Sequence, residues 1–256
     1  MNEEETLKEI QRLEVKAPEQ VATYDWLDRM MELVGHLNSD PNIELLNVEI
    51  HPSLPLVVEQ TMSDSAGFDI PLEMLSFYRV TDGFDLSWRL KESPFDFEVG
   101  GDIKLFGFGQ VFSNWIDSLW GVTKDGASTQ ELDFSWDIRG FDGAQEEGAY
   151  STVLHVPEDV EQIDLYFHDP KGKSHLLAMS FSDYLEALIL SGGLHGWQYL
   201  LLEELAPAQS EEEKLAQQCA QALKHVFPLR DLSALEVEDV LLRVPLSSQI
   251  LKGEEE

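Results

Sequence analysis

Apolar residues recur at helical spacing near the start of the chain. Residues 3–15 form one such segment, and a second begins at Pro18, a favoured first residue of a helix, and ends near His36. A third follows Pro71. Between them, residues 43–50 have the composition of either a short strand or an ordered connector. This part of the chain is therefore predicted to be mainly helical.

The period changes from helical to two at Gly83. Alternate residues after this glycine are large and apolar, as in a strand with one buried face: Phe84, Leu86, Trp88 and Leu90. Further segments have strand character: 97–109, 132–138, 150–156, 162–168 and 174–180. Gly100 and Gly101 are expected to form a turn or a bulge in the first of these. Residues 168–174 have the composition of a hairpin turn.

The last part of the chain returns to helical spacing. Ser182 is expected to cap a helix that ends at the Ser-Gly-Gly sequence 191–193. Further helices are predicted at 193–205 and 211–226. Strands joined by short loops, with helices before and after them, are typical of an α+β fold. We therefore predict a largely antiparallel sheet of about five or six strands flanked by N-terminal and C-terminal helices.

The chain is strongly acidic, with 49 acidic and 17 basic residues and a formal net charge of −32. Such a charge repels nucleic acids and anionic membranes, so neither is expected as a partner. It attracts basic proteins, because long-range electrostatic attraction raises the rate of encounter. The first residues are acidic and contain no apolar run of the length of a secretory signal, so we expect a cytoplasmic protein.

Sequence motifs of catalysis are absent. The phosphate-binding and dinucleotide-binding glycine patterns, GxSxG and HExxH do not occur. Cys219 lies in a segment of helical period, where packing is its expected role. His168 and His175 are expected to face each other across the hairpin, but two ligands do not make a metal site. We therefore expect no catalytic residue, no cofactor and no metal.

Asp82 and Asp85 flank the change from helical to strand period. Either carboxyl group can act as a general acid or base if it is buried beside a pocket. Asp82 also has a simpler interpretation as a turn residue before Gly83, whose missing Cβ permits a positive φ. A hydrolase that uses Asp82, Asp85 or His168 in a pocket at the end of the sheet therefore stays open as an alternative.

Three stretches of the chain, IPLEMLSFYRVTDGF, GGDIKLFG and SFSDYLEALIL, together resemble the SUKH superfamily, the Smi/Knr-like domains. The family pattern is a helix that starts at a proline and ends in an aspartate-glycine or asparagine-glycine turn, then a sheet and a closing helix. Its features fall on Pro71, Leu75, Phe77, Asp82, Gly83, Gly101, Ile103, Phe181, Ser182, Tyr184 and Leu185. The resemblance covers residues 54–205, which leaves 1–53 as an N-terminal helical extension and 206–256 as a C-terminal helical extension with an acidic tail.

The resemblance implies a binding domain without enzymatic activity. The superfamily includes fungal regulators of cell-wall synthesis and bacterial immunity proteins that neutralise toxins. An acidic member suits a basic, nuclease-like toxin domain, because its carboxylates can occupy a site made for phosphates. The exposed carboxylates expected to contact a partner are Asp82, Asp85, Glu146, Glu147 and Asp169. A regulatory scaffold that docks through its terminal helices is a further alternative.

Overall fold

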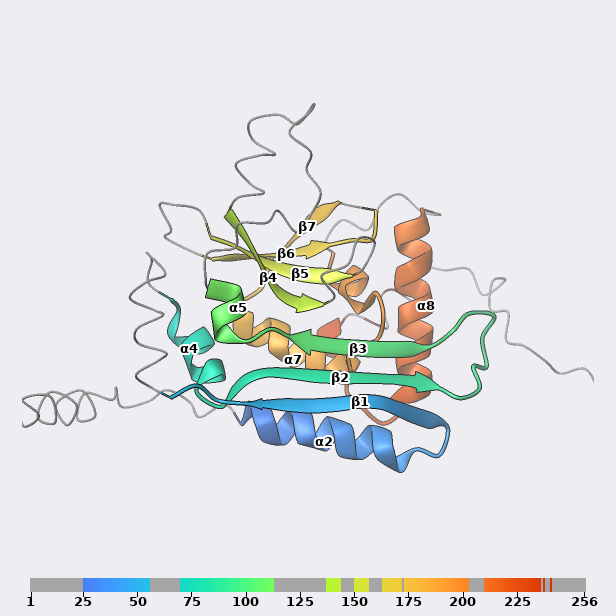
Figure 1. Cartoon of the computed structure of the whole chain (residues 1–256). Coiled ribbons are helices and arrows are strands. Elements are labelled where there is room, and N and C mark those ends of the chain that lie inside the picture. The colour runs from blue at the N-terminus through green and yellow to red at the C-terminus, as the bar shows by residue number, and fades with distance from the viewer. Residues whose placement is uncertain are drawn as a thin grey trace, which may run out of the picture.

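Seven strands of the described residues form one antiparallel sheet in which each strand pairs with its neighbours in the sequence (Figure 1). The computed structural model describes residues 25–55, 70–112, 137–143, 150–156, 163–171, 173–202, 210–235, 237 and 240. The strands are β1 (Ile43–Pro52), β2 (Thr81–Leu90), β3 (Gly100–Leu105), β4 (Ile138–Gly143), β5 (Ser151–His155), β6 (Asp164–His168) and β7 (Ser174–Leu177). The predicted α+β class with an antiparallel sheet is confirmed. The additional strand is β1, formed by a segment that suited either a strand or a connector.

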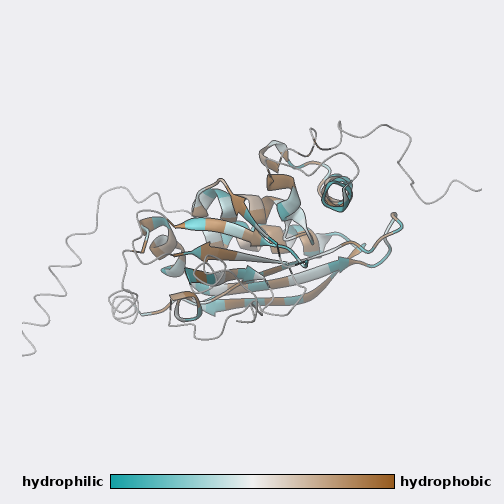
Figure 2. Cartoon of the chain, turned by 90° about the horizontal axis from the view of Figure 1, so that it is seen from above, coloured by the Kyte–Doolittle hydropathy of each residue, from teal (hydrophilic) through white to brown (hydrophobic). Residues whose placement is uncertain are grey.

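The helices of the described residues pack around this sheet. They are α2 (Trp26–Ser39), α4 (Leu72–Tyr78), α5 (Phe108–Phe112), α7 (Phe181–Ser191) and α8 (Glu211–Val226), with two short 3-10 helices, η1 (Trp197–Leu201) and η2 (Ser233–Leu235). In Figure 1, α2 runs beside β1 and α7 lies behind the strands. Figure 2 shows α8 end on, beside the other helices. Among the described helices, none combines the length and the apolar composition needed to cross a membrane.

The hydrophobic core contains the apolar face predicted for β2. Its four alternating side chains are all buried: Phe84, Leu86, Trp88 and Leu90. Side chains of α2, α7 and α8 belong to the same hydrophobic cluster. Cys219 of α8 is buried in this cluster, as expected for helix packing, and burial raises the pKa of its thiol to about 12.

Segments expected in the two extensions contribute to this sheet and core where they are described. Within residues 1–53, β1 pairs with β2 from Ile43 opposite Leu90 to Pro52 opposite Thr81. Within residues 206–256, the buried side of α8 packs next to η1 and the core. These described segments therefore surround the same core as the strands between them.

Two predicted elements differ in position or kind. The strand expected at 132–138 is β4, which begins only at Ile138, and residues 132–136 lie outside the described residues. An α-helix was expected over 193–205, but its described residues contain only the short 3-10 helix η1, and residues 203–205 lie outside the described residues. Apolar spacing indicated burial in both cases, but it did not fix the boundaries or the type of helix.

Gly100 and Gly101 were wrongly expected to form a turn or a bulge. Both lie within β3, where Gly101 is opposite Trp88. A Cβ at Gly101 would lie 2.6 Å from the Trp88 indole nitrogen and 2.8 Å from the Gly193 carbonyl oxygen. The missing side chain therefore serves close packing, a role that glycine can also have inside a strand.

The cap of α7 is Ser180 and not Ser182, which corrects the expectation. The Ser180 Oγ accepts a hydrogen bond from the Asp183 backbone N–H (3.1 Å). Ser182 lies in the first turn, where its hydroxyl donates to Glu73 of α4 (2.8 Å). The predicted end of the helix is confirmed, because Gly192 adopts a left-handed conformation with a φ of 62°.

Candidate functional site

The sheet opens between β3 and β4. Among the described residues, Leu105 and Asp142 are the one pair in register between these strands. The preceding part of β3 pairs instead with the loop that follows α7, where the Asp102 backbone N–H donates to the Gly193 carbonyl (2.9 Å). This loop takes the place of a strand next to β3, so a cleft remains between β3 and the strands beyond it.

Gly193 is necessary for this arrangement. Its φ is +67°, a conformation that side chains with a Cβ rarely adopt. A Cβ here would lie 2.5 Å from both the Asp102 carbonyl oxygen and Ile103 Cγ1. The adjacent Gly192 carbonyl accepts a hydrogen bond from the Trp88 indole N–H (2.7 Å). The two glycines therefore end α7 and also bring the backbone against β2 and β3.

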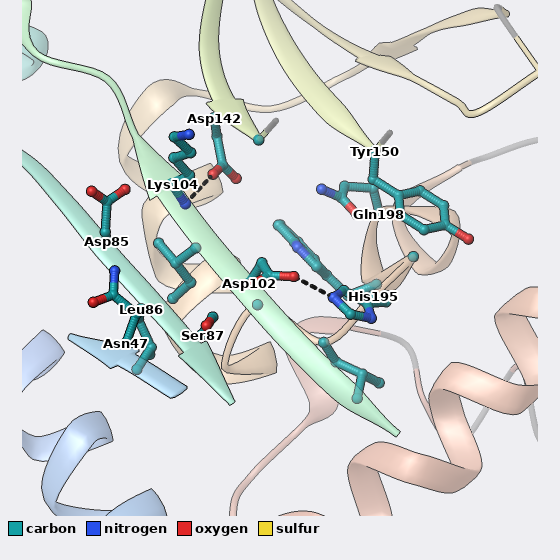
Figure 3. Close-up of a pocket in the computed structure, with 16 residues that line it drawn as sticks. Asn47, Asp85, Leu86, Ser87, Asp102, Lys104, Asp142, Tyr150, His195 and Gln198 are labelled. Carbon is teal, nitrogen blue, oxygen red and sulfur yellow. Dashed lines mark hydrogen bonds and ion pairs between the residues drawn. The ribbon is translucent and has the colours of Figure 1, made fainter. Parts of the chain in front are cut away.

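The β3–β4 cleft has a volume of about 490 Å³, within the range of roughly 300–1,000 Å³ that is usual for ligand pockets. Its polar lining includes Asp85, Asp102, Asp142, Tyr150, His195 and Gln198. Figure 3 shows Asp102 and Lys104 along β3, with Tyr150 and Gln198 across the opening from them. Apolar side chains such as Ile103 and Trp197 complete the walls.

Asp142 is a buried carboxylate in the wall of this cleft. Its Oδ2 accepts a hydrogen bond from the Tyr184 hydroxyl (2.6 Å), and its Oδ1 accepts one from the Lys104 backbone N–H (3.1 Å). Burial raises the pKa of Asp142 to about 6, although these hydrogen bonds act in the opposite direction. A carboxyl group with this pKa can exchange a proton near neutral pH, as a general acid or base does.

Gln198 presents a buried acceptor without a donor. Tyr184 gives its single hydroxyl hydrogen to Asp142, so Thr152 (2.7 Å) and the Gln198 amide act as donors toward the Tyr184 oxygen. The Gln198 NH₂ group is thus directed at Tyr184. Its Oε1 is buried and has no hydrogen-bond partner among the described residues. An unpaired acceptor of this kind costs about 1–3 kcal/mol, so it needs an explanation.

Two histidine-carboxylate pairs lie near the mouth of the cleft. His195 and Asp102 are both about half exposed, and His195 Nε2 lies 2.5 Å from Asp102 Oδ2. On β1, His51 Nε2 lies 3.1 Å from Asp85 Oδ2. In the described lining, Lys104 is the one lysine or arginine, against three aspartates. The cleft therefore carries a net negative charge and favours a cation.

The outer face of β1, β2 and β3 carries acidic residues next to this cleft. Glu49 is opposite Asp85, and Asp102 is opposite Ser87, a register that places the three carboxylates on one face. Glu49 and Asp102 are exposed, and Asp85 is partly exposed. Lys104, opposite Asp85, offsets part of their charge. We call the surface formed by Glu49, Asp85 and Asp102 the acidic sheet face.

Glu49, His51 and Asp85 are the described residues best placed to hold a metal ion. Each offers one ligand atom, and these atoms lie within 4.8 Å of one another. Two of the residues are carboxylates and the third is a histidine, a set that suits several divalent ions. Three ligands leave a site open to solvent, so the cluster has the composition of a metal site without its full coordination shell.

The predicted contact residues have different surroundings. Asp85 is part of the lining of the β3–β4 cleft. The Asp82 Oδ1 accepts a hydrogen bond from the Phe108 backbone N–H (2.7 Å), and burial raises the pKa of this partly buried carboxyl group. Glu146 and Glu147 lie outside the described residues. Of the two that are described, Asp85 lines the β3–β4 cleft and Asp82 does not.

Asp169 was wrongly expected to be an exposed carboxylate. It is 1% exposed. Its Oδ1 accepts hydrogen bonds from the backbone N–H groups of Lys171 and Lys173 (2.9 Å each), and its Oδ2 lies 3.2 Å from His175 Nε2. The carboxylate thus folds back to hold the hairpin turn, a common use of aspartate that composition alone did not distinguish from surface exposure.

The hairpin predicted at 168–174 is confirmed, but the two histidines are not opposite each other. His168 is opposite Ser174, and Phe167 is opposite His175. The register differs from the expected one by a single position, which moves a side chain to the other face. His168 Nδ1 lies 3.0 Å from Ser174 Oγ. The three residues of the hydrolase alternative, Asp82, Asp85 and His168, therefore have separate partners.

Apart from Asp85, the polar residues that line the cleft were not predicted from the sequence. Asp142 falls in a stretch whose strand was expected several residues earlier, and it lies 38 residues from Lys104 and 42 residues from Tyr184, its two partners. Gln198 was placed in an expected α-helix. The one local signal near Asp142 is the aspartate-glycine pair at 142–143, which repeats the pair at 82–83. Such a pair is typical of an ordinary turn, so it did not indicate a buried carboxylate.

Comparisons with protein-family models, with curated proteins and with solved structures gave no match to this chain.

Proposed function

We propose that the protein is a cytoplasmic binding module without enzymatic activity that binds and neutralises a basic, nuclease-like toxin domain. This is the role implied by the resemblance of its sequence to the immunity proteins of the SUKH superfamily. The observation that carries the proposal is the acidic sheet face, where Glu49, Asp85 and Asp102 stand on one surface of a sheet next to a negatively charged cleft.

The charge of the chain supports this proposal physically. A net charge of −32 raises the rate at which a basic partner is encountered and keeps nucleic acids away. A rigid sheet face then holds its carboxylates at fixed spacing, as a site for several basic side chains requires. By occupying residues that would contact phosphates, such a surface would block a nuclease directly.

The edge strand β1 adds exposed apolar area on the other face of the sheet, because Val48 is opposite Leu86 and Ile50 is opposite Phe84, whereas Glu49 is opposite Asp85. Leu46, Val48 and Ile50 of β1 are 53%, 39% and 39% exposed. In the described part of the sheet, β1 pairs with β2 and forms one edge. A partner that contacts this edge strand can reach apolar side chains on one face and Glu49 on the other, a mixed composition that is typical of protein interfaces. Charge would therefore steer the partner, and β1 would contribute area that is removed from water on binding.

Affinity capture tests the proposal. The purified protein is incubated with lysate of its own source at low salt, and bound proteins are released by rising salt and identified. We expect one basic protein, retained in stoichiometric amount and released at high salt, because screening weakens charge pairs. Co-expression with the chain should then relieve the growth inhibition that this partner causes.

Two matched variants localise the interaction. The first changes the acidic sheet face (Glu49→Gln, Asp85→Asn, Asp102→Asn), and the second removes the same charge from the exposed β2–β3 loop (Glu92→Gln, Asp96→Asn, Glu98→Gln). Capture should be lost in the first variant and kept in the second. Equal loss in both would show that only net charge matters, and no captured protein at any salt would contradict the proposal.

A hydrolase is the second candidate, and Asp142 is the observation that favours it. This buried carboxyl group has a pKa of about 6 and lies in the wall of a cleft of about 490 Å³. It would act as the general acid or base. A substrate screen with the wild-type protein and Asp142→Asn tests this: turnover that the substitution abolishes would support a hydrolase, and no turnover with any substrate would leave the binding function as the better account.

A further inference from the structure

The β3–β4 cleft offers hydrogen-bond acceptors to a ligand. The Gln198 Oε1 is buried without a donor among the described residues. Asp142 accepts from Tyr184 and from the backbone N–H groups of Lys104 and Gly143. Because a carboxylate has about four acceptor positions, one position remains on Asp142. A ligand that matches these groups must donate hydrogen bonds.

These acceptors are held in fixed positions. Tyr184 contacts both Asp142 and Gln198, and its own hydroxyl is oriented by Thr152. Figure 3 shows the Gln198 side chain extending toward the opening, across from Asp102 on β3. Side chains that are ordered before a ligand arrives lose little entropy on binding. The orphan acceptor is therefore part of a preorganised site rather than of a flexible surface.

The walls of the cleft suit a side chain with an apolar stem. Leu86, Ile103 and Trp197 line it with apolar atoms, and Tyr150 adds a partly buried aromatic ring. A long basic side chain buries its methylene groups against such surfaces while its charged end reaches polar groups. An aromatic ring next to the charge attracts a cation further.

We propose that the cleft binds the guanidinium group of an arginine side chain that the basic partner presents. This inference rests on the proposed function and names the group that the site recognises. A guanidinium carries five N–H donors and no acceptor, and it stays charged at all relevant pH values. It can donate to Gln198 Oε1 and Asp142 together, and Asp102 at the mouth adds an opposite charge. A lysine ammonium has three N–H donors on one nitrogen, without the planar fork of the guanidinium, and therefore fits two separated acceptors less well.

A titration with small probes tests the site directly. The ¹⁵N-labelled full chain is titrated at low salt with the peptide acetyl-Gly-Arg-Gly-amide, with its neutral citrulline analogue and with free L-arginine. We expect saturable shifts of the Gln198 side-chain amide and of the 193–198 backbone with the arginine peptide, and none with the citrulline peptide. Equal shifts with both peptides, or no saturable shift in the cleft, would overturn the proposal.

The comparison between the arginine probes identifies the source of the guanidinium. Binding of the peptide as tight as or tighter than binding of free L-arginine supports a protein side chain. If free L-arginine binds at least about tenfold more tightly than the peptide, a difference of about 1.4 kcal/mol, the site is assigned to a small molecule. A protein side chain as the source of the guanidinium would then be wrong.

Three variants separate a specific contact from general electrostatics. Gln198→Met keeps the approximate length of the side chain and removes the acceptor, and Asp102→Asn neutralises a carboxylate that is about half exposed and pairs with His195. Each of these two substitutions should weaken binding of the arginine peptide by about tenfold, as expected when a charged or buried hydrogen bond is lost. The control Asp96→Asn, in the exposed loop, should leave the affinity unchanged. Equal weakening in all three would contradict the proposal.

The failures of the two proposals are distinguishable. If a basic partner is captured and binds Gln198→Met and Asp102→Asn as tightly as the wild type, the arginine site is wrong and the binding function stands. If the arginine peptide binds in the cleft but no protein is captured, the guanidinium site stands and the toxin-binding function is wrong.

Discussion

The hydroxyl of Tyr184 and the carboxylate of Asp142 are joined by a buried hydrogen bond of 2.6 Å between α7 and β4. Asp142 is 3% exposed and Tyr184 is fully buried. The bond links the closing helix to the strand at which the sheet opens, so it positions the wall of the β3–β4 cleft. It also leaves a carboxyl group in a place where ionisation is costly, with a consequence for stability that can be measured.

The stability of the protein should depend on pH through Asp142. Its pKa rises from an ordinary value of 3.8 to about 6 on folding, mainly because of burial. Between these values the folded state keeps a proton that the unfolded state has lost, so ionisation at higher pH destabilises the folded state. The free energy of unfolding, relative to an Asp142→Asn variant, should therefore fall by about 1.4 kcal/mol from pH 5 to pH 7.5. Urea unfolding of both proteins at the two pH values measures this difference.

The sign of that effect distinguishes Asp142 from the exposed carboxylates. Hydrogen bonds lower the pKa of Glu211 and of Asp231, so these groups favour the folded state as pH rises. The subtraction of the Asn variant removes their contribution, because both proteins contain them. A difference that is constant with pH, or one that grows in favour of the wild type, would show that Asp142 is not destabilised by burial.

Gly193→Ala should destabilise the fold and disturb the cleft. A Cβ here meets the Asp102 carbonyl oxygen and Ile103 at 2.5 Å, and the φ of +67° adds strain. We expect a loss of about 2 kcal/mol or more in the free energy of unfolding. The control is Gly35→Ala in α2, where no atom lies within 4 Å of the new Cβ and where a gain of about 0.5–1 kcal/mol is expected. Equal effects of the two substitutions in denaturant unfolding would refute the packing role of Gly193.

The two serines at the start of α7 should have unequal effects. Ser180→Ala removes the acceptor of the Asp183 backbone N–H and should cost about 1 kcal/mol, a usual value for a helix N-cap. Ser182→Ala removes a side-chain bond to Glu73 at a partly exposed position and should cost about half as much. Thermal unfolding of the two variants compares them. A larger cost for Ser182→Ala would show that the cap is at Ser182, as the sequence suggested.

Asp169 should act in the hairpin turn rather than in partner binding. Asp169→Ala leaves the backbone N–H groups of Lys171 and Lys173 without their acceptor, which should cost about 1–3 kcal/mol. Asp169→Asn keeps the oxygen that both groups use and should cost less. Partner capture by the stable Asn variant should equal that of the wild type. A loss of capture without a loss of stability would restore Asp169 as a contact residue.

The sequence by itself determined the elements whose pattern is local. The period of two after Gly83 defines the buried face of β2, because alternate side chains of a strand point to opposite faces. The Ser-Gly-Gly sequence defines the end of α7, since glycine tolerates the left-handed conformation that ends a helix. The run of helices, strands and helices was sufficient for the α+β class, and the excess of acidic residues was sufficient to favour a basic partner.

The tertiary structure decided which polar groups meet. Asp142, Tyr184 and Gln198 come from a strand, a helix and a 3-10 helix. Asp142 lies 42 residues before Tyr184, and no local period links the three. Their contact depends on how β4, α7 and η1 pack together, which is decided by pairing between segments that are distant in the sequence. The same holds for Asp169, because a carboxylate is exposed or buried according to the turn that forms around it. Composition states which charges a chain carries, and only the packed fold fixes the surface on which they act.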